Sequence, residues 1–383
     1  MEFDFLHPLS DDIIEHIQSL SSQNLGSKVV LHSKSDFPDI NKVQLAIIGV
    51  LENRGDSNQI NDVDLTAIRK EFYSLYPGNW QASIADLGDI KAGEELSDTY
   101  FALKSVVGTL IKKRIVPIII GGSQDLTYAM YRSYDTLEQM VNLVSIDSKF
   151  DLGKENATDM ALSYLTRIIL EEPNNLFNYS VVGYQTYNNA QEEIDLMEKL
   201  FFDGYRLGEV SSNIKVSEPV FRDADIVTLD LTSIQSSSSG NFATFVPNGF
   251  NGKEICSLAR YSGLSDKLSL FGIFNHNNSK SEAVLIAQIL WYFIEGFECR
   301  SNEYPFTSKE DYIKYIVPLE MEELVFYKSN KSDRWWIEVP QIINRHTKTE
   351  KNSLLPCSYE DYLGAINQEI PERWWKTQRK NII

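Results

Sequence analysis

The sequence predicts an α/β fold in which helices enclose a mostly parallel sheet, giving three layers (αβα). Short apolar runs recur along the chain with helical stretches between them, a rhythm typical of parallel strands joined by crossover helices. Several of the runs are apolar at nearly every position, as strands covered on both faces require. The predicted strands are residues 43–50, 116–120, 142–146, 180–183, 225–231 and 268–274.

The segments between these runs supply the covering helices. Residues 99–113 carry a helical apolar stripe that ends in a basic turn, and residues 190–202 and 281–296 have comparable patterns. The only low-complexity patch is 236–240, four serines and a glycine just after a predicted strand. We expect this patch to be a mobile loop.

The pattern changes after Gly296, which predicts an α/β domain at residues 1–300 and an extension at 301–383 packed on it. Residues 323–328 and 334–339 resemble two strands around a polar turn, so we expect a β-hairpin in the extension. Four of the six tryptophans lie here, each beside an arginine or another tryptophan: Trp335, Trp336, Trp374 and Trp375. Such side chains either fill a core or anchor a partner at an interface.

Composition narrows the function classes. The formal net charge is −18, from 54 acidic and 36 basic residues, which argues against a nucleic-acid partner. The three cysteines are widely spaced and form no C-x-x-C pair, so neither a disulfide framework nor a thiolate metal site is expected. The N-terminal residues lack a signal-peptide pattern, and the longest apolar stretch is too short to span a bilayer. We therefore expect a cytoplasmic protein without membrane insertion.

Polar residues follow three of the predicted strands, at the edge where ligands of parallel α/β sheets bind. The first group is Gly121, Gly122, Ser123, Gln124 and Asp125, the second contains Asp147, Lys149 and Asp151, and the third contains Asp230 and Thr232. Three carboxylates gathered there would repel one another unless a cation, Lys149 or backbone amides lie between them. Each aspartate could also simply cap the next helix or turn.

The same three places resemble the motifs of the arginase and formimidoylglutamase (ureohydrolase) family, Gly-Gly-x-His, Asp-x-His-x-Asp and Asp-x-Asp, in that order. Residues 49–55, 249–263 and 267–278 are also similar to family segments, so the resemblance covers roughly residues 40–297. It implies an arginase-like fold. It also implies two manganese ions, held by the six motif side chains, that activate water for attack on a guanidinium or formimidoyl carbon.

The departures from the family pattern fall at the positions that would bind metal and substrate. The two motif histidines fall on Gln124 and Lys149, and the second aspartate of Asp-x-Asp falls on Thr232. The family's substrate-binding glutamate falls on Asn275. Of the six implied metal ligands only three aspartates remain, and we count Ser123, Lys149, Thr232 and Asn275 as pocket residues.

These losses are uneven between the two implied metal sites. One site keeps Asp147, Asp151 and Asp230 and exchanges its histidine for Gln124, whose amide oxygen suits a hard cation such as Mg²⁺ or Ca²⁺. The other loses two ligands, and a protonated Lys149 cannot bind a metal. We expect no cofactor or one weakly bound divalent cation, and the sequence argues against a two-manganese centre.

Three functions follow from this pattern. The first is a catalytically inactive member, a pseudoenzyme, that binds a protein partner or forms a homo-oligomer. The second is a C–N hydrolase of a guanidino or formimidoyl compound that uses one residual metal site. The third is a sensor that binds a cationic metabolite against the carboxylates. The missing ligands favour the first.

Overall fold

The structure is a computed structural model, and it describes residues 3–57, 62–137, 139–154, 159–303, 310–320, 322–344 and 349–382. A ten-stranded sheet forms its centre, with strand order β1-β4-β3-β5-β10-β9-β6-β7-β8 and β2 beside β4. Only β1 runs antiparallel to its neighbour among the described pairs. The strands are β1 (Leu6–His7), β2 (Val30–Leu31), β3 (Leu45–Leu51), β4 (Ile84–Lys91), β5 (Val116–Gly121), β6 (Val141–Ile146), β7 (Leu176–Tyr184), β8 (Asp203–Arg206), β9 (Ile226–Asp230) and β10 (Leu270–Phe274).

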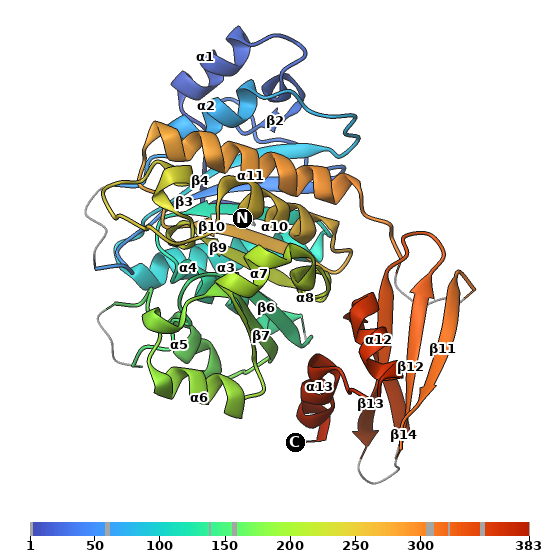
Figure 1. The fold of residues 1–383 in the computed structure, drawn as a ribbon. Helices are drawn as coiled ribbons and strands as arrows, with labels where there is room; N and C mark the ends of the chain where they lie inside the picture. Colours follow the sequence, from blue (N-terminus) through green and yellow to red (C-terminus); the bar gives the residue numbers. More distant parts are fainter. Residues whose placement is uncertain are drawn as a thin grey trace.

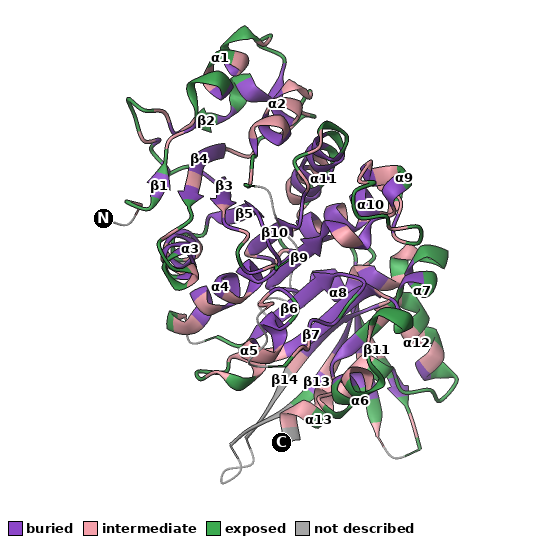
Figure 2. Ribbon diagram, turned by 90° about the vertical axis from the view of Figure 1, so that its left-hand side faces the viewer, coloured by how far each residue is buried: buried purple, intermediate pink, exposed green. Residues whose placement is uncertain are grey.

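Helices cover both faces of this sheet, so the predicted three-layer fold is confirmed (Figure 1). One core lies between the sheet and α3, α4 and α5, and a second lies between the sheet and α1, α2, α10 and α11. Figure 2 shows α3, α4 and α5 on one side of the strands and α10 and α11 on the other. The helices are α1 (Asp11–Ser19), α2 (Thr66–Ser74), α3 (Leu96–Lys112), α4 (Leu126–Arg132), α5 (Tyr164–Leu170), α6 (Gln191–Lys199), α7 (Leu207–Ser212), α8 (Glu218–Arg222), α9 (Ser236–Ser239), α10 (Gly252–Leu264) and α11 (Lys280–Glu298).

The apolar composition of the central strands explains their position. Every residue of β5, β6, β9 and β10 is buried, as expected for strands between two helical layers. Helix caps fix where the covering helices begin. The Ser279 hydroxyl accepts a hydrogen bond from the Glu282 amide at the start of α11, and Asn251 and Glu254 form a capping box at the start of α10.

The serine-rich segment is a helix, so the expectation of a mobile loop at 236–240 is wrong. Ser236–Ser239 form α9, and Gly240 ends it with a left-handed φ of 71°. The Ser236 hydroxyl accepts a hydrogen bond from the Val246 amide at 2.8 Å, and Ser239 is buried. Tertiary hydrogen bonds therefore order a segment whose composition resembles a linker.

The C-terminal extension has its own four-stranded antiparallel sheet, in the order β11-β12-β13-β14. Its elements are β11 (Tyr312–Pro318), β12 (Glu323–Ser329), β13 (Trp335–Asn344), β14 (Thr349–Cys357), α12 (Tyr359–Ile366) and α13 (Glu372–Ile382). β12 pairs with β13 in antiparallel register, with Phe326 opposite Ile337, so the predicted hairpin is confirmed. The extension touches α8, where Arg222 donates to the Cys357 carbonyl at 3.0 Å.

Three of the four C-terminal tryptophans are packed inside the chain. Trp335 and Trp374 belong to the core of the extension, and Trp336 lies 4.6 Å beneath the Arg222 guanidinium of the main domain. Only Trp375 is exposed, at 38%. Of the two roles expected for these tryptophans, Trp335, Trp336 and Trp374 therefore fill a core, and they offer no surface for a partner. Among the described helices, none combines the length and apolarity needed to cross a membrane.

Candidate functional site

The candidate site lies at the carboxyl ends of four adjacent strands, β5, β10, β9 and β6. Their register places these ends side by side: Phe274 of β10 pairs with Asp230 of β9, and Ile146 of β6 pairs with Leu229. The residues that follow the strands therefore converge on one cavity. The cavity has a volume of about 660 Å³, and Gln124, Lys149, Asp151, Asp230, Thr232 and Asn275 line it.

Asp147 and Asp151 form a buried carboxyl pair, with exposed fractions of 1% and 6%. The Lys149 amide donates to Asp147 Oδ1 at 2.9 Å, whereas Oδ2 of each aspartate has no hydrogen-bond partner in the described part of the chain. Burial, together with the neighbouring carboxylates, raises the pKa of Asp147 well above its usual range and that of Asp151 to about 8. The pair therefore retains a proton near neutral pH when no cation is present.

Asp230 is the best-satisfied of the three aspartates. The Thr232 amide donates to its Oδ1 and the Asn275 side-chain amide donates to its Oδ2, both at 2.7 Å. Burial still raises the pKa of Asp230, although these hydrogen bonds oppose the shift. Thr232 thus contributes its backbone amide to the site, and Asn275 fixes the orientation of the carboxylate.

Two amide side chains add unpaired oxygens to the cavity. Gln124 is 1% exposed, and its Nε2 faces the Thr228 hydroxyl at 3.5 Å while its Oε1 has no partner. Asn275 sits at a left-handed φ of 62°, a conformation that asparagine tolerates, and its Oδ1 is also unpaired. Because a carboxylate can only accept, the bond to Asp230 must come from Nδ2, which leaves Oδ1 as the free atom.

These oxygens fit a hard divalent cation better than a manganese pair. In the described part of the chain, no group of three or more His, Cys, Asp and Glu side chains is arranged to hold a metal ion. A cation at the Asp147–Asp151 pair would therefore need the amide oxygen of Gln124, and amide and carboxylate oxygens are the ligands of Mg²⁺ and Ca²⁺. Oδ2 of Asp147, Oδ2 of Asp151 and Oε1 of Gln124, each buried without a partner among the described residues, are the oxygens that would bind it.

Lys149 is exposed at the cavity rather than inserted between the aspartates. It makes no ion pair with any residue that the structure describes, although its charge lowers the pKa of Asp151 and Asp230. The position of the ammonium leaves the carboxyl pair without a neutralising contact. Ser123, expected in the pocket, is fully buried and is not among the residues that line the cavity.

His276 follows the end of β10, and from the sequence it could either face the pocket or contact solvent. We would expect a loop histidine to contact solvent, but His276 is only 5% exposed and lines the cavity next to Asn275. Both of its ring nitrogens lack hydrogen-bond partners, and burial lowers its pKa to about 4. The imidazole is therefore neutral at pH 7, with a nitrogen free to take up a proton.

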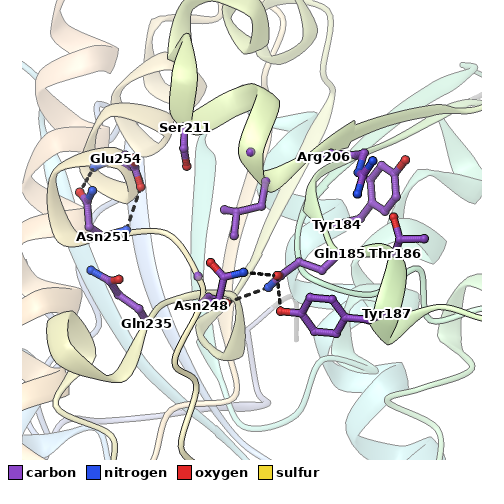
Figure 3. A pocket seen from close by; sticks show the side chains of 13 residues that line it. Tyr184, Gln185, Thr186, Tyr187, Arg206, Ser211, Gln235, Asn248, Asn251 and Glu254 are labelled. Carbon is purple, nitrogen blue, oxygen red and sulfur yellow. Dashed lines mark hydrogen bonds between the residues drawn. The ribbon is translucent and has the colours of Figure 1, made fainter.

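A polar wall separates this cavity from a second one of about 420 Å³. Gln185, Tyr187 and Asn248 line both cavities. Figure 3 shows them in the smaller one. Gln185 Nε2 donates to the Asn248 carbonyl at 2.8 Å, the Asn248 side-chain amide donates to Gln185 Oε1 at 2.9 Å, and the Tyr187 hydroxyl donates to the same Oε1. No sequence motif indicated this wall, because its members come from segments more than sixty residues apart.

The fold and the site define a three-layer α/β protein with an oxygen-lined cavity at the carboxyl ends of its central strands. A model of the arginase family matches residues 58–285, more than half of the chain. The chain therefore belongs to the arginase family.

Two curated relatives match part of the chain. A formimidoylglutamase of Staphylococcus epidermidis is 30% identical over 128 residues, which cover 33% of this chain and 40% of the relative. A formimidoylglutamase of Lysinibacillus sphaericus is 25% identical over 198 residues, covering 49% of this chain and 60% of the relative. The matches thus span less than two thirds of these curated relatives.

Solved structures share the fold at low sequence identity. Formiminoglutamase of Trypanosoma cruzi with Mn²⁺ is 17% identical, with a TM-score of 0.62 over 72% of this chain and 99% of that one. Formimidoylglutamase of Bacillus subtilis is 13% identical, with a TM-score of 0.62 over 70% and 91%. An agmatine ureohydrolase of Thermoplasma volcanium is 18% identical, with a TM-score of 0.58 over 75% and 98%.

Proposed function

We propose that the protein hydrolyses a C–N bond in a linear amidine, a formimidoyl or guanidino compound, with one divalent cation bound by Gln124, Asp147 and Asp151 beside Asp230. The observation that carries this proposal is the set of buried side-chain oxygens without partners at the strand ends. Membership of the arginase family and the formimidoylglutamase relatives support the reaction class. Of the functions that the sequence leaves open, this one accounts for the unpaired oxygens.

The donor set favours one hard cation. Carboxylate and amide oxygens suit Mg²⁺ or Ca²⁺, and a second cation would lie beside Lys149 and Thr232, which offer an ammonium and a hydroxyl in place of strong ligands. When bound, a divalent cation at such a site supplies Lewis-acid polarisation of water.

The chain's own residues can perform the remaining tasks. Asn275 Oδ1 is an unpaired acceptor for an N–H group of the amidine, because Nδ2 already donates to Asp230. Asp56 and Asp62 line the cavity outside the proposed cation site, and their negative charge favours an amidinium. His276 is neutral and has free ring nitrogens, so it can hold a proton released by water and return it to the departing amine.

A second candidate is a pseudoenzyme that serves as a protein-binding scaffold or homo-oligomer. It is favoured by the residues at the family's ligand positions, where Gln124, Lys149 and Thr232 stand in place of two histidines and an aspartate. This candidate predicts a protein that binds no catalytic cation and turns over no amidine.

The two candidates differ in metal content and turnover. Purified protein, treated with chelator and then supplied with Mg²⁺, Ca²⁺ or Mn²⁺, should bind one hard cation per chain by elemental analysis and release product from a formimidoyl or guanidino compound. Asp147→Asn should abolish both properties, whereas Asp195→Asn, a change of an exposed aspartate on α6, should alter neither. Absence of turnover for arginine, agmatine, guanidinobutyrate and formimidoylglutamate with every cation would favour the scaffold.

A further inference from the structure

Large aromatic side chains stand exposed at the mouth of the cavity. Tyr187 and Phe245 line it with exposed fractions of 71% and 66%. Phe242, 67% exposed, stacks on Phe245 with ring centroids 6.5 Å apart and an interplanar angle of 17°. We call Tyr187, Phe242 and Phe245 the aromatic rim. Exposed apolar groups gathered beside a cavity indicate a binding surface.

The backbone that carries the rim is held in place by hydrogen bonds. The Ser236 amide donates to the Val246 carbonyl at 2.8 Å, and the Val246 amide donates to the Ser236 hydroxyl at the same distance. The Gln185 side chain donates to the Asn248 backbone carbonyl and accepts from the Asn248 side-chain amide and the Tyr187 hydroxyl (Figure 3). The rim is therefore presented by an anchored segment, which reduces the entropy lost when a ligand packs on it.

The charge of the cavity is opposite to what an anionic ligand needs. Among the described residues that line it, four are aspartates, Asp56, Asp62, Asp151 and Asp230, and Lys149 is the only lysine or arginine. A ligand with a carboxylate tail would meet more negative than positive charge on entering. A ligand with a cationic head and an uncharged tail would meet complementary charge at the floor and apolar surface at the mouth.

We infer that the ligand of this site joins a cationic amidine head to an aromatic or similarly apolar tail, with the head at the aspartates and the tail against the aromatic rim. This inference rests on the proposed function for the nature of the head. The nature of the tail is inferred from the aromatic rim and from the charges of the residues that line the cavity. A ring placed on Phe245 and Tyr187 would bury apolar area and gain aromatic stacking, and the amidinium would face Asp151 and Asp230.

Three guanidines with one head and different tails test the inference by calorimetric binding at neutral pH. They are phenethylguanidine with an aryl tail, agmatine with a cationic tail and 4-guanidinobutyrate with an anionic tail. We expect phenethylguanidine to bind most tightly and guanidinobutyrate most weakly. Phe245→Ala should weaken phenethylguanidine about tenfold, the effect of losing one apolar contact surface of this size, and leave agmatine within about twofold.

Phe101→Ala is the matched control, because Phe101 is an exposed phenylalanine on α3 that does not line the cavity. It should leave all three affinities unchanged. The inference is overturned if guanidinobutyrate or formimidoylglutamate binds most tightly, if Phe245→Ala weakens all three guanidines equally, or if none binds. Turnover is scored separately: rim-dependent binding without hydrolysis keeps the inference and rejects the proposed function, and hydrolysis of a tightly bound dicarboxylate does the reverse.

Discussion

Among the residues that the structure describes, buried carboxylates occur both at the cavity and at the junction with the C-terminal extension, but only those at the junction are paired with cations. At the junction, Asp223 contacts Lys267 at 3.3 Å and Arg373 at 3.2 Å, and Asp203 contacts Lys376 at 3.3 Å. At the strand ends, Asp147 and Asp151 each leave an oxygen without a partner among the described residues, and burial raises the pKa of both. Paired carboxylates hold two parts of the chain together, whereas unpaired ones are arranged for a ligand that the chain itself does not supply.

The largest expected effect concerns the junction. Arg373→Met removes the side chain that donates to Asp223 and to the Pro356 carbonyl, so a buried charge loses a partner. Breaking one partner of such a pair should lower the free energy of unfolding by about 3 kcal/mol, measured by urea denaturation. Arg379→Met, at an exposed position on the same helix, should cost less than about 0.5 kcal/mol. Equal effects of the two changes would show that the junction pairs contribute no stability.

Removing a charged group from the cavity should raise the free energy of unfolding, whereas removing one from the junction should lower it. The pKa of Asp151 is about 8 in the folded protein, above its ordinary value, so the folded state binds a proton that the unfolded state has released. Stability is therefore lost as pH rises from about 4 to 8. In chelated protein at pH 8, Asp151→Asn should raise the free energy of unfolding by about 2 kcal/mol.

A pH series of thermal unfolding measures this effect. The gain from Asp151→Asn should disappear near pH 4, where the wild-type carboxyl is protonated in both states. Mg²⁺ or Ca²⁺ at pH 8 should stabilise the wild type and not the variant, and Asp195→Asn should reproduce neither result. If Asp151→Asn instead destabilises the protein at pH 8, the Asp151 carboxylate stabilises the fold, as the paired carboxylates of the junction do.

The strands whose residues are mostly apolar were predictable from the sequence, and β4 was not. The predicted runs at 116–120 and 142–146 lie within β5 and β6. β4 was missed because its apolar pattern is interrupted by Asp86 and Asp89, which pair in the interior with Arg69 at 2.8 and 2.7 Å. An ion pair between residues about twenty positions apart hides a buried strand from any local pattern.

Some residues of the site were likewise predictable from the sequence, and others were not. Asp147, Asp151 and Asp230 were found because they directly follow recognisable strands, and the ends of neighbouring parallel strands meet. The burial of His276 depends on how its loop packs, a property that no spacing encodes. The aromatic rim was missed because Phe242 and Phe245 follow a serine-rich segment that resembles a linker but folds as α9. The role of Lys149, exposed and without an ion pair among the described residues, is likewise set by tertiary structure.

His276 gives a smaller test of the cavity, with the opposite pH dependence to Asp151. Burial lowers its pKa to about 4, so below pH 6.5 the unfolded state takes up a proton that the folded state does not. Its contribution to stability is present above pH 6.5 and is lost as pH falls to about 4. Asp64 is the charged group that opposes this shift, and the pKa of nearby Glu282, raised to about 7 by burial, gives a slope of opposite sign.

The difference in the free energy of unfolding between His276→Gln and wild type isolates the contribution of His276, because Glu282 is present in both proteins. The variant should gain about 2 kcal/mol of stability relative to wild type between pH 6.5 and pH 4, measured by denaturant unfolding at each pH. Glu282→Gln should instead gain relative to wild type as pH rises from about 4.5 to 7. A pH-independent difference for His276→Gln would mean that the imidazole is solvated and unavailable as the buried base of the proposed reaction.

The smallest expected effect comes from two helix-cap substitutions, which test whether the two sheets unfold together. The Ser279 hydroxyl caps α11 beside the cavity, and the Ser358 hydroxyl accepts from the Asp361 amide to cap α12 in the extension. Each change to alanine should cost about 1 kcal/mol, the usual value of a helix cap. If the paired charges of the junction couple the two parts, Ser279→Ala and Ser358→Ala will shift one common unfolding transition, followed by both circular dichroism and tryptophan fluorescence. If Ser358→Ala shifts only the fluorescence of the tryptophan-rich extension, the extension unfolds on its own, and the junction carboxylates stabilise a contact between two independent domains.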